Sequence, residues 1–391
     1  MRPLEGLTVV SLEQAVAAPL ATRHLADLGA RVIKIERPGV GDFARAYDTN
    51  VDGLSSNFVW LNRSKESMTL NLKEPDAEQI LFRLLSRADV FVQNLAPGAA
   101  ARLSLGSDRL RQRYPSLVVC NISGYGAPGP YQNKKAYDLL IQSETGLLSI
   151  TGTEQTPSKV GISIADISAG MYAYSGILTA LLCRQQTKQG TVVEVSLFEA
   201  LGEWMGYPAY YTYGGQVPAR AGASHASIAP YGPFQSKDGK AVYLGIQNER
   251  EWERFCRVVL QRSELAVDGR FGSNTNRVAN RRELHAVIDE VFCRLDAGEI
   301  IERLTAAQIA NARMNTVREF VEHPQLRARN RWRTVESPVG PVPALIPPVD
   351  IEGVEPSMGP IPSLGQHTEE ILLEVGFDAP TVSKWRERGV I

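Results

Sequence analysis

The feature that most constrains the fold of this chain is a repeated change of hydrophobic period over residues 7–205. Short runs rich in Val and Ile, such as LTVVSLE (7–13), ARVIKIE (30–36) and SLVVCNISGY (116–125), alternate with segments whose apolar residues recur three or four positions apart. This alternation is typical of βαβ units and a parallel sheet. The sequence therefore predicts an α/β fold whose ligand loops follow the carboxyl ends of the strands.

The residue composition and the hydrophobic pattern change after residue 205. The stretch YYTYGGQVPARAGASHASIAPYGPF is rich in Gly, Ala, Ser and Pro and is typical of a long connection. Strand and helix patterns then resume, and proline-rich turns and two helical patterns follow them. We expect four segments: a large domain (1–205), a linker (206–230), a small domain (231–328) and a C-terminal segment (329–391).

Composition excludes several classes of partner. Lys and Arg total 42 and Asp and Glu total 43, so no overall charge favours nucleic acid or an anionic membrane. No apolar run is long enough to span a bilayer, and the first residues lack the apolar core of a signal peptide. The four cysteines are far apart in apolar settings, which predicts buried thiols in a reducing compartment. A cytoplasmic protein without a metal site is expected.

Familiar cofactor and hydrolase motifs are missing. The first predicted strand-to-helix turn reads SLEQAVAAPLA and lacks the GxGxxG pattern with which a backbone approaches a dinucleotide. The P-loop, HExxH and GxSxG patterns are also absent. A nicotinamide or flavin enzyme, a phosphoryl transferase and a serine hydrolase are therefore disfavoured.

Basic residues recur at the expected ligand edge of the sheet. They are Arg37, Lys73, Arg102, Lys134 and Lys135. Taken singly, each is most simply a solvated surface cation. Together they suit a phosphorylated ligand.

Asp166 is the most informative single residue. It stands in VGISIADISAGMYAYSGILTALL (160–182), between an apolar run that predicts a strand and a small-residue run that predicts a helix. An Asp before a helix is commonly only an N-cap. The same position would also favour an ionised carboxylate that is available as a nucleophile, and the small neighbours leave room for a reacting group.

Seven stretches together resemble a known family. They are PLEGLTVVSLEQAVAAP, LGARVIKIERPGVGDFAR, LNRSKESMTLNLK, DVFVQNLAPGAAARLSLG, NISGYGAPGPY, KKAYDLLIQSETGLLSITG and ADISAGMYAYSGILTAL. They are similar to the family III CoA-transferases (the CaiB/BaiF or formyl-CoA transferase group), which also includes acyl-CoA racemases. The resemblance runs through essentially the whole chain, and its motifs are concentrated before residue 200.

The resemblance implies a mechanism and a set of site residues. Asp166 matches the catalytic aspartate that forms mixed anhydride and aspartyl-CoA thioester intermediates, with acyl-CoA as a substrate and no permanently bound cofactor. Eight residues fall where the family holds CoA: Arg37, Leu70, Lys73, Asn94, Leu95, Arg102, Lys135 and Tyr137. The family also implies a Rossmann-like large domain closed by the C-terminal segment, a smaller α+β domain joined by long linkers, and an interlocked homodimer.

Branches within the family differ in their residues. Racemases carry a His-Asp pair where this chain has Tyr137 and Asp138, and a phenol is a poor proton shuttle at neutral pH, so transfer is favoured over racemisation. The run ASHASIAPYGPF resembles the branch that acts on C4 and C5 dicarboxylates, with His225 and Arg220 as candidates to hold a distal carboxylate; a structural loop histidine is the alternative. A CoA-binding homologue without catalysis is a further alternative. The family's gating glycine run has no convincing counterpart at Gly214, so no gating role is assigned there.

Overall fold

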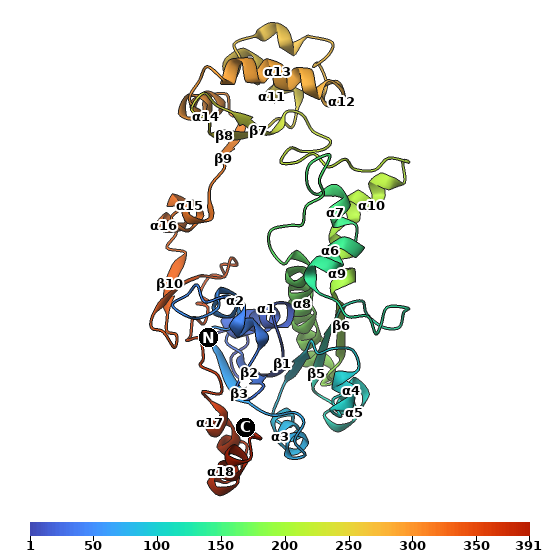
Figure 1. Cartoon of the computed structure of the whole chain (residues 1–391), viewed down its shortest axis with the longest axis vertical. Helices are drawn as coiled ribbons and strands as arrows, with labels where there is room; N and C mark the ends of the chain where they lie inside the picture. Colours follow the sequence, from blue (N-terminus) through green and yellow to red (C-terminus); the bar gives the residue numbers. More distant parts are fainter. The chain divides into compact units, whose positions relative to one another are not determined.

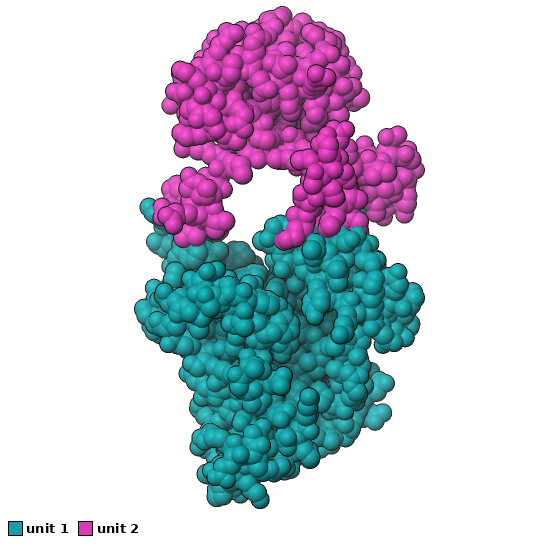
Figure 2. Space-filling view, in the orientation of Figure 1, with its two compact units in different colours: residues 1–145, 160–207, 327–391 teal, residues 146–159, 208–326 magenta.

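A computed structural model describes residues 1–391, and the chain divides into two compact units (Figure 2). Unit 1 comprises residues 1–145, 160–207 and 327–391, and unit 2 comprises residues 146–159 and 208–326. The first unit is therefore built from three separate stretches of the chain.

Unit 1 is built on a six-stranded sheet of order β3-β2-β1-β4-β5-β6 in which all strands are parallel. The strands are β1 (Thr8–Leu12), β2 (Arg31–Glu36), β3 (Lys65–Thr69), β4 (Val90–Gln93), β5 (Val118–Ser123) and β6 (Val192–Ser196). The predicted α/β class and parallel sheet are confirmed. This strand order is that of doubly wound nucleotide-binding folds, in which ligand loops gather at the carboxyl ends of the strands.

Helices cover both faces of this sheet (Figure 1). In chain order, the helices of unit 1 are α1 (Ala17–Asp27), the 3-10 turn η1 (Phe43–Ala46), α2 (Ser56–Leu61), α3 (Asp76–Leu85), α4 (Ala99–Arg102), α5 (Ser107–Arg113), α6 (Asp138–Glu144), α8 (Ile164–Thr187), α9 (Leu197–Trp204), α17 (Thr368–Glu374) and α18 (Ala379–Glu387). A short hairpin of β10 (Trp332–Val335) and β11 (Val342–Leu345) precedes the last two helices.

The C-terminal helices belong to the core of unit 1. Alternate strand residues such as Val10, Ile33 and Phe91 form one apolar cluster with α3, α17 and α18, and Trp385 of α18 is buried in it. No member of this cluster comes from α1 or α8, which pack against each other and against strands from the opposite face.

The apolar run before Asp166 is not a strand. Residues 160–163 form an irregular loop, and α8 begins at Ile164. The Val160 N–H donates to the side chain of Gln142 rather than to a neighbouring strand. The sixth strand is instead Val192–Ser196, after α8, so the prediction of a strand at residues 160–165 was wrong.

Unit 2 has its own apolar core. A three-stranded antiparallel sheet, β7 (Tyr231–Gln235), β8 (Ala241–Gly245) and β9 (Ala310–Arg313), accompanies helices that include α11 (Glu249–Arg254), α12 (Asn274–Ala279), α13 (Arg281–Phe292) and α14 (Ala297–Ala306). Aromatic residues of the helices and their connections form its centre. The remaining helices are α7 (Leu147–Ile150), α10 (Gly206–Thr212), the π-helix η2 (Phe255–Val259), the 3-10 turn η3 (Ser263–Ala266), α15 (Val317–Val321) and α16 (Pro324–Ala328).

Two predictions about burial and membranes can be compared with the structure. Cys120 and Cys256 are buried, but Cys183 and Cys293 are exposed, so the prediction that all four thiols are buried was wrong. Cys183 lies on α8, and Cys293 directly follows α13. The apolar residues next to each cysteine in the sequence point to the opposite face of the helix, so they do not bury the thiol. None of the helices combines the length and the apolar character that crossing a bilayer requires.

Candidate active site

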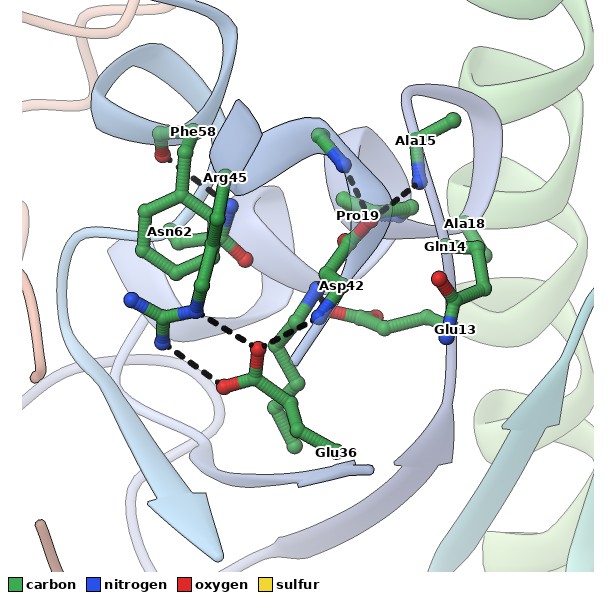
Figure 3. A network of polar contacts seen from close by, with 12 residues as sticks. Glu13, Gln14, Ala15, Ala18, Pro19, Glu36, Asp42, Arg45, Phe58 and Asn62 are labelled. Carbon is green, nitrogen blue, oxygen red and sulfur yellow. Dashed lines mark hydrogen bonds and ion pairs between the residues drawn. The ribbon is translucent and has the colours of Figure 1, made fainter. Parts of the chain in front are cut away.

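A network of buried charges lies at the carboxyl ends of β1 and β2 (Figure 3). We call it the buried ion network; it comprises Glu13, Lys34, Glu36, Asp42, Arg45 and Lys65. Lys34 Nζ donates to Asp42 (2.7 Å) and Glu13 (3.3 Å), and Lys65 Nζ donates to Glu13 (2.6 Å). The two lysines hold the pKa of Glu13 at about 2 despite its burial, so it remains ionised at neutral pH.

The buried ion network fixes the loop that leads from β1 into α1. Asp42 Oδ1 accepts hydrogen bonds from the N–H groups of Ala15 (3.0 Å) and Ala44 (2.9 Å). Ala15 has a φ of 62°, a left-handed conformation that disfavours a residue with a Cβ. On the other side of the loop, Asn94 exchanges hydrogen bonds with the backbone N–H and carbonyl of Gln14, each at 2.9 Å. The loop is therefore held from both sides.

This loop and Asp166 line the same cavity, whose volume is about 1010 Å³. Val16 is the N-cap residue of α1, and it offers no side-chain hydrogen bond to the first N–H groups of that helix. No acidic residue lies in its first turn. The wall of the cavity thus includes an uncapped helix start, which favours negative charge.

Asp166 is the third residue of α8, and the N-cap is Ser163. The N-cap interpretation of Asp166 is therefore wrong. Its carboxylate makes no hydrogen bond or ion pair, although it lies in the first turn of a 24-residue helix. A carboxylate of this kind is available to a ligand in the cavity.

Burial and the negative charge of Asp138 raise the pKa of Asp166 to about 7. The sequence predicts that the helix N-terminus keeps this group ionised. Instead, loss of solvent and a neighbouring like charge outweigh the helix dipole. The group is held between its charged and neutral forms near neutral pH.

Asp138 also secures the start of α8. Its Oδ1 accepts a hydrogen bond from the Ala165 N–H (2.8 Å), and its Oδ2 accepts one from Gln142 (2.7 Å). Gln142, which is fully buried on α6, in turn accepts from the Val160 N–H (3.0 Å). The segment before Asp166 is therefore pinned to α6, and the carboxylate that perturbs Asp166 is fixed in place.

The structure brings together some of the residues expected to hold CoA. Asn94, Leu95, Lys135 and Tyr137 line the cavity that contains Asp166. The other four do not line it: Arg37, Lys73 and Arg102 are exposed, and Leu70 is buried in the core of unit 1. The side chain of Leu70 faces other apolar residues, and its N–H donates to Glu36 O, so its carbonyl is the group left for a ligand.

The two adjacent lysines of this loop differ. Lys134 forms an ion pair with Glu144 and lies over the rings of Tyr125 and Tyr131. Lys135 is exposed and has no such partner. Lys135 is thus the lysine of the pair that is free to meet an anionic ligand.

Arg220 and His225 lie in unit 2, whereas Asp166 lies in unit 1. Arg220 donates to the carbonyl oxygens of Ser149, Thr153 and Glu154. His225 stacks on Tyr231, and its Nδ1 accepts from the Ser227 N–H (3.2 Å). Both side chains therefore have structural contacts, and their role toward a substrate carboxylate stays a prediction.

Sequence reasoning missed Tyr47 and Asn57, which line the cavity together with Asp166. Burial and the negative charges of Asp42 and Asp166 raise the pKa of Tyr47 to about 12, so its hydroxyl stays protonated. Both residues follow long irregular stretches after β2, where no period or motif singles out a residue. Tyr47 lies next to a charge-rich turn, and that was the only available signal.

No group of three or more His, Cys, Asp or Glu side chains is arranged to hold a metal ion. Most residues that line the cavity with Asp166 are hydrogen-bonding, small or apolar groups of the kind that surround an organic ligand, and a few, such as Asp138 and Lys135, are charged.

Comparison with known proteins places this geometry in a family. Residues 4–368 match CoA-transferase family III. The chain belongs to this family. The human succinyl-CoA:glutarate CoA-transferase is 32% identical over 397 residues, which cover 100% of this chain and 90% of that protein. The succinyl-CoA:mesaconate CoA-transferase of Haloarcula marismortui is 31% identical, with 97% and 98% covered.

Solved structures agree with this assignment. A CaiB/BaiF family protein from Brucella suis superposes with a TM-score of 0.84 at 31% identity, and the match covers 96% of this chain and 99% of that one. The predicted family is therefore confirmed. The prediction that the protein is an enzyme, a family III CoA-transferase, is confirmed by the same comparisons.

The buried ion network generates a prediction about stability. Asp42→Asn keeps an oxygen for the Ala15 and Ala44 N–H groups but removes the charge that pairs with Lys34. Breaking one partner of a buried pair should lower the free energy of unfolding by about 3 kcal/mol, measured by urea denaturation. The exposed Asp52→Asn variant is the control and should change it by less than about 0.5 kcal/mol. Equal effects of the two variants would contradict a structural role for the pair.

Proposed function

We propose that this enzyme transfers CoA from succinyl-CoA to a C4 or C5 dicarboxylate through covalent intermediates on Asp166. The observation that carries the proposal is the state of Asp166, a half-buried carboxylate without a hydrogen-bond partner at the wall of a large cavity. Burying a charged group without a partner is unfavourable, so such a group points to chemistry rather than to stability.

The proposed reaction proceeds by acyl exchange. An Asp166 oxygen attacks the thioester carbonyl, the carbon–sulfur bond breaks, and an aspartyl-acyl anhydride and CoA thiolate form. The thiolate attacks the aspartyl carbonyl, which releases the donor acid and leaves an aspartyl-CoA thioester. The acceptor carboxylate attacks this thioester to give a second anhydride and thiolate. Attack of the thiolate on the acceptor's acyl carbon yields the new acyl-CoA and free Asp166.

The start of α1 suits the charge that develops in these steps. Each attack on a carbonyl places negative charge on oxygen, and preorganised N–H donors stabilise such an oxyanion. The N–H groups of Ala17 and Ala18 belong to the uncapped first turn, and Ala17 lines the cavity with Asp166. We assign these N–H groups the role of oxyanion donors.

CoA itself is assigned to the eight residues that the family resemblance selects: Arg37, Leu70, Lys73, Asn94, Leu95, Arg102, Lys135 and Tyr137. All of them belong to unit 1, as does Asp166. Four of them share the cavity with Asp166, and the exposed cations Arg37, Lys73 and Arg102 suit the phosphates.

The substrate class is supported by relatives. Proteins named as succinyl-CoA transferases for glutarate, mesaconate and L-malate are each 30% to 32% identical to this chain over nearly its whole length. We extend their class to this enzyme, with itaconate and citramalate as further candidate acceptors and with His225 and Arg220 as candidate contacts to the distal carboxylate.

We also propose that two chains form the working enzyme, an interlocked homodimer of the kind the family resemblance implies. Large apolar side chains of α8 and α9 are exposed in the single chain, among them Leu182 (62% exposed) and Trp204 (46%). Exposed apolar surface of this kind favours a protein partner. Light scattering after size-exclusion chromatography should give twice the mass of one chain; a monomer would contradict this part of the proposal.

The proposal predicts the effect of Asp166→Asn. CoA exchange between succinyl-CoA and glutarate, mesaconate, malate, itaconate or citramalate should fall about a thousandfold or more, because an amide cannot form the anhydride. In the wild-type enzyme, mass spectrometry of peptides after mixing with succinyl-CoA should find CoA attached at Asp166.

Folding of this variant can be checked independently. Because the pKa of Asp166 is raised to about 7 in the folded protein, the fold is favoured at low pH, where the buried carboxyl is neutral, and this contribution is lost as pH rises through 7. Asn carries no charge to bury, so the variant should melt at or above the wild-type temperature at pH 8.

Undiminished exchange by a folded Asp166→Asn variant would overturn the proposal. A CoA-binding homologue without catalysis would show no adduct, and a racemase would exchange the α-hydrogen with solvent.

The pKa of Asp166 predicts a pH profile. The ionised form is the nucleophile, so kcat/KM for succinyl-CoA should rise with pH and level off above a midpoint near 7. Asp138→Asn removes the negative charge that raises this pKa and should move the midpoint to lower pH. Glu370 is an exposed residue of α17 and does not line the cavity, so Glu370→Gln removes one charge elsewhere and should leave the midpoint in place. An unmoved midpoint in Asp138→Asn would contradict the electrostatic account.

A further inference from the structure

Helix α8 carries two glycines at which a neighbouring element approaches unusually closely. They are Gly170, which faces the start of α1, and Gly176, which faces β6. The two differ in what a side chain would meet there. Only Gly170 lies against the backbone of the cavity wall.

At Gly170 the contact is with a backbone atom. A Cβ built at this position would lie 2.7 Å from the carbonyl oxygen of Ala17 and 3.1 Å from the Cβ and Cδ2 of Leu20. A carbonyl oxygen at the first residue of a helix cannot rotate away as a side chain does. An alanine at this position would therefore push the start of α1 and the first turns of α8 apart by several tenths of an ångström.

This contact lies one helical turn from the reacting group. Asp166 precedes Gly170 by four residues, so the two share one face of α8. Ala17 and Asp166 line the same cavity. Since Asp166 has no hydrogen bond of its own, its distance from the N–H groups of α1 depends on how closely the two backbones approach.

We propose that Gly170 is a positioning residue for CoA transfer: the backbone contact it permits between α8 and Ala17 holds the Asp166 carboxylate at reacting distance from the uncapped start of α1. This inference rests on the proposed function, because it takes Asp166 as the nucleophile and the α1 N–H groups as the donors that stabilise the oxyanion. It adds a residue that touches neither substrate nor reacting atoms.

The test is Gly170→Ala in the full chain, with kcat and KM measured separately. A displacement of less than an ångström at a nucleophile should lower kcat about 10- to 100-fold. The KM for succinyl-CoA should change little, because the residues assigned to CoA lie on other elements. The rate at which the CoA adduct forms on Asp166 should fall in parallel with kcat.

Gly176→Ala is the matched control. It is the same substitution in the same helix, and its Cβ would also be too close to a neighbour, at 2.8 Å from Val193 Cγ1. That neighbour is a side chain of β6, on an element that does not carry the α1 loop. The control should keep kcat within about twofold of wild type. A Gly176→Ala loss equal to that of Gly170→Ala would show that only packing is disturbed, and would overturn the inference.

A second pair of variants covers the case in which Gly170→Ala does not fold. Leu20→Ala combined with Gly170→Ala removes the contact with Leu20 Cδ2 and keeps both the contact with the Cβ of residue 20 and the clash with the Ala17 carbonyl. Its kcat should fall about 10- to 100-fold below that of Leu20→Ala alone. Equal kcat values in this pair, or wild-type kcat in Gly170→Ala itself, would overturn the inference.

Asp166→Asn separates this inference from the proposed function. If that variant keeps full exchange activity, the covalent role of Asp166 fails, and the role of Gly170 fails with it. If Asp166→Asn is inactive while Gly170→Ala turns over normally, the proposed function stands and only the positioning role is lost.

Discussion

The interaction on which the rest of unit 1 depends is the buried ion network at the strand ends. Charges removed from water are tolerated only when each has a partner, so the positions of Glu13, Lys34 and Asp42 determine one another. Asp42 in turn holds the left-handed Ala15 through its N–H. The place where α1 begins, and with it one wall of the cavity, is therefore held by these buried charges on one side of the loop and by Asn94 on the other.

Asp166 presents the opposite arrangement. The carboxylates of the buried ion network are paired, and the pKa of Glu13 stays low, whereas Asp166 is left without a partner beside Asp138 and its pKa rises to about 7. A folded chain gains no stability from this. Proteins retain such locally unfavourable groups where function requires them. Under the proposed mechanism, the raised pKa makes the carboxylate a better nucleophile while leaving a useful fraction ionised at neutral pH.

Much of the fold could be read from the sequence because burial on both faces gives central parallel strands continuous apolar runs. Val9 and Val10 of β1 and the Val-rich β5 are of this kind. β3 was harder: it begins at Lys65 and Glu66, which look like surface residues until Glu13 and Arg31 are seen to pair with them. The run before Asp166 looked like a strand but contains no residue that pairs with the sheet. Gln142, distant in sequence, takes one of its N–H groups instead.

The sequence by itself determined the family, the α/β class and the candidate nucleophile, because motifs, hydrophobic period and residue type are local properties. Only the tertiary structure decided which groups surround Asp166. Asp138, Tyr47 and the start of α1 come from three separate segments, and the cavity they share exists only once the strands are aligned. The tertiary structure also sets the pKa of Asp166. Desolvation and like-charge repulsion depend on distances in space, and no spacing along the chain encodes those distances directly.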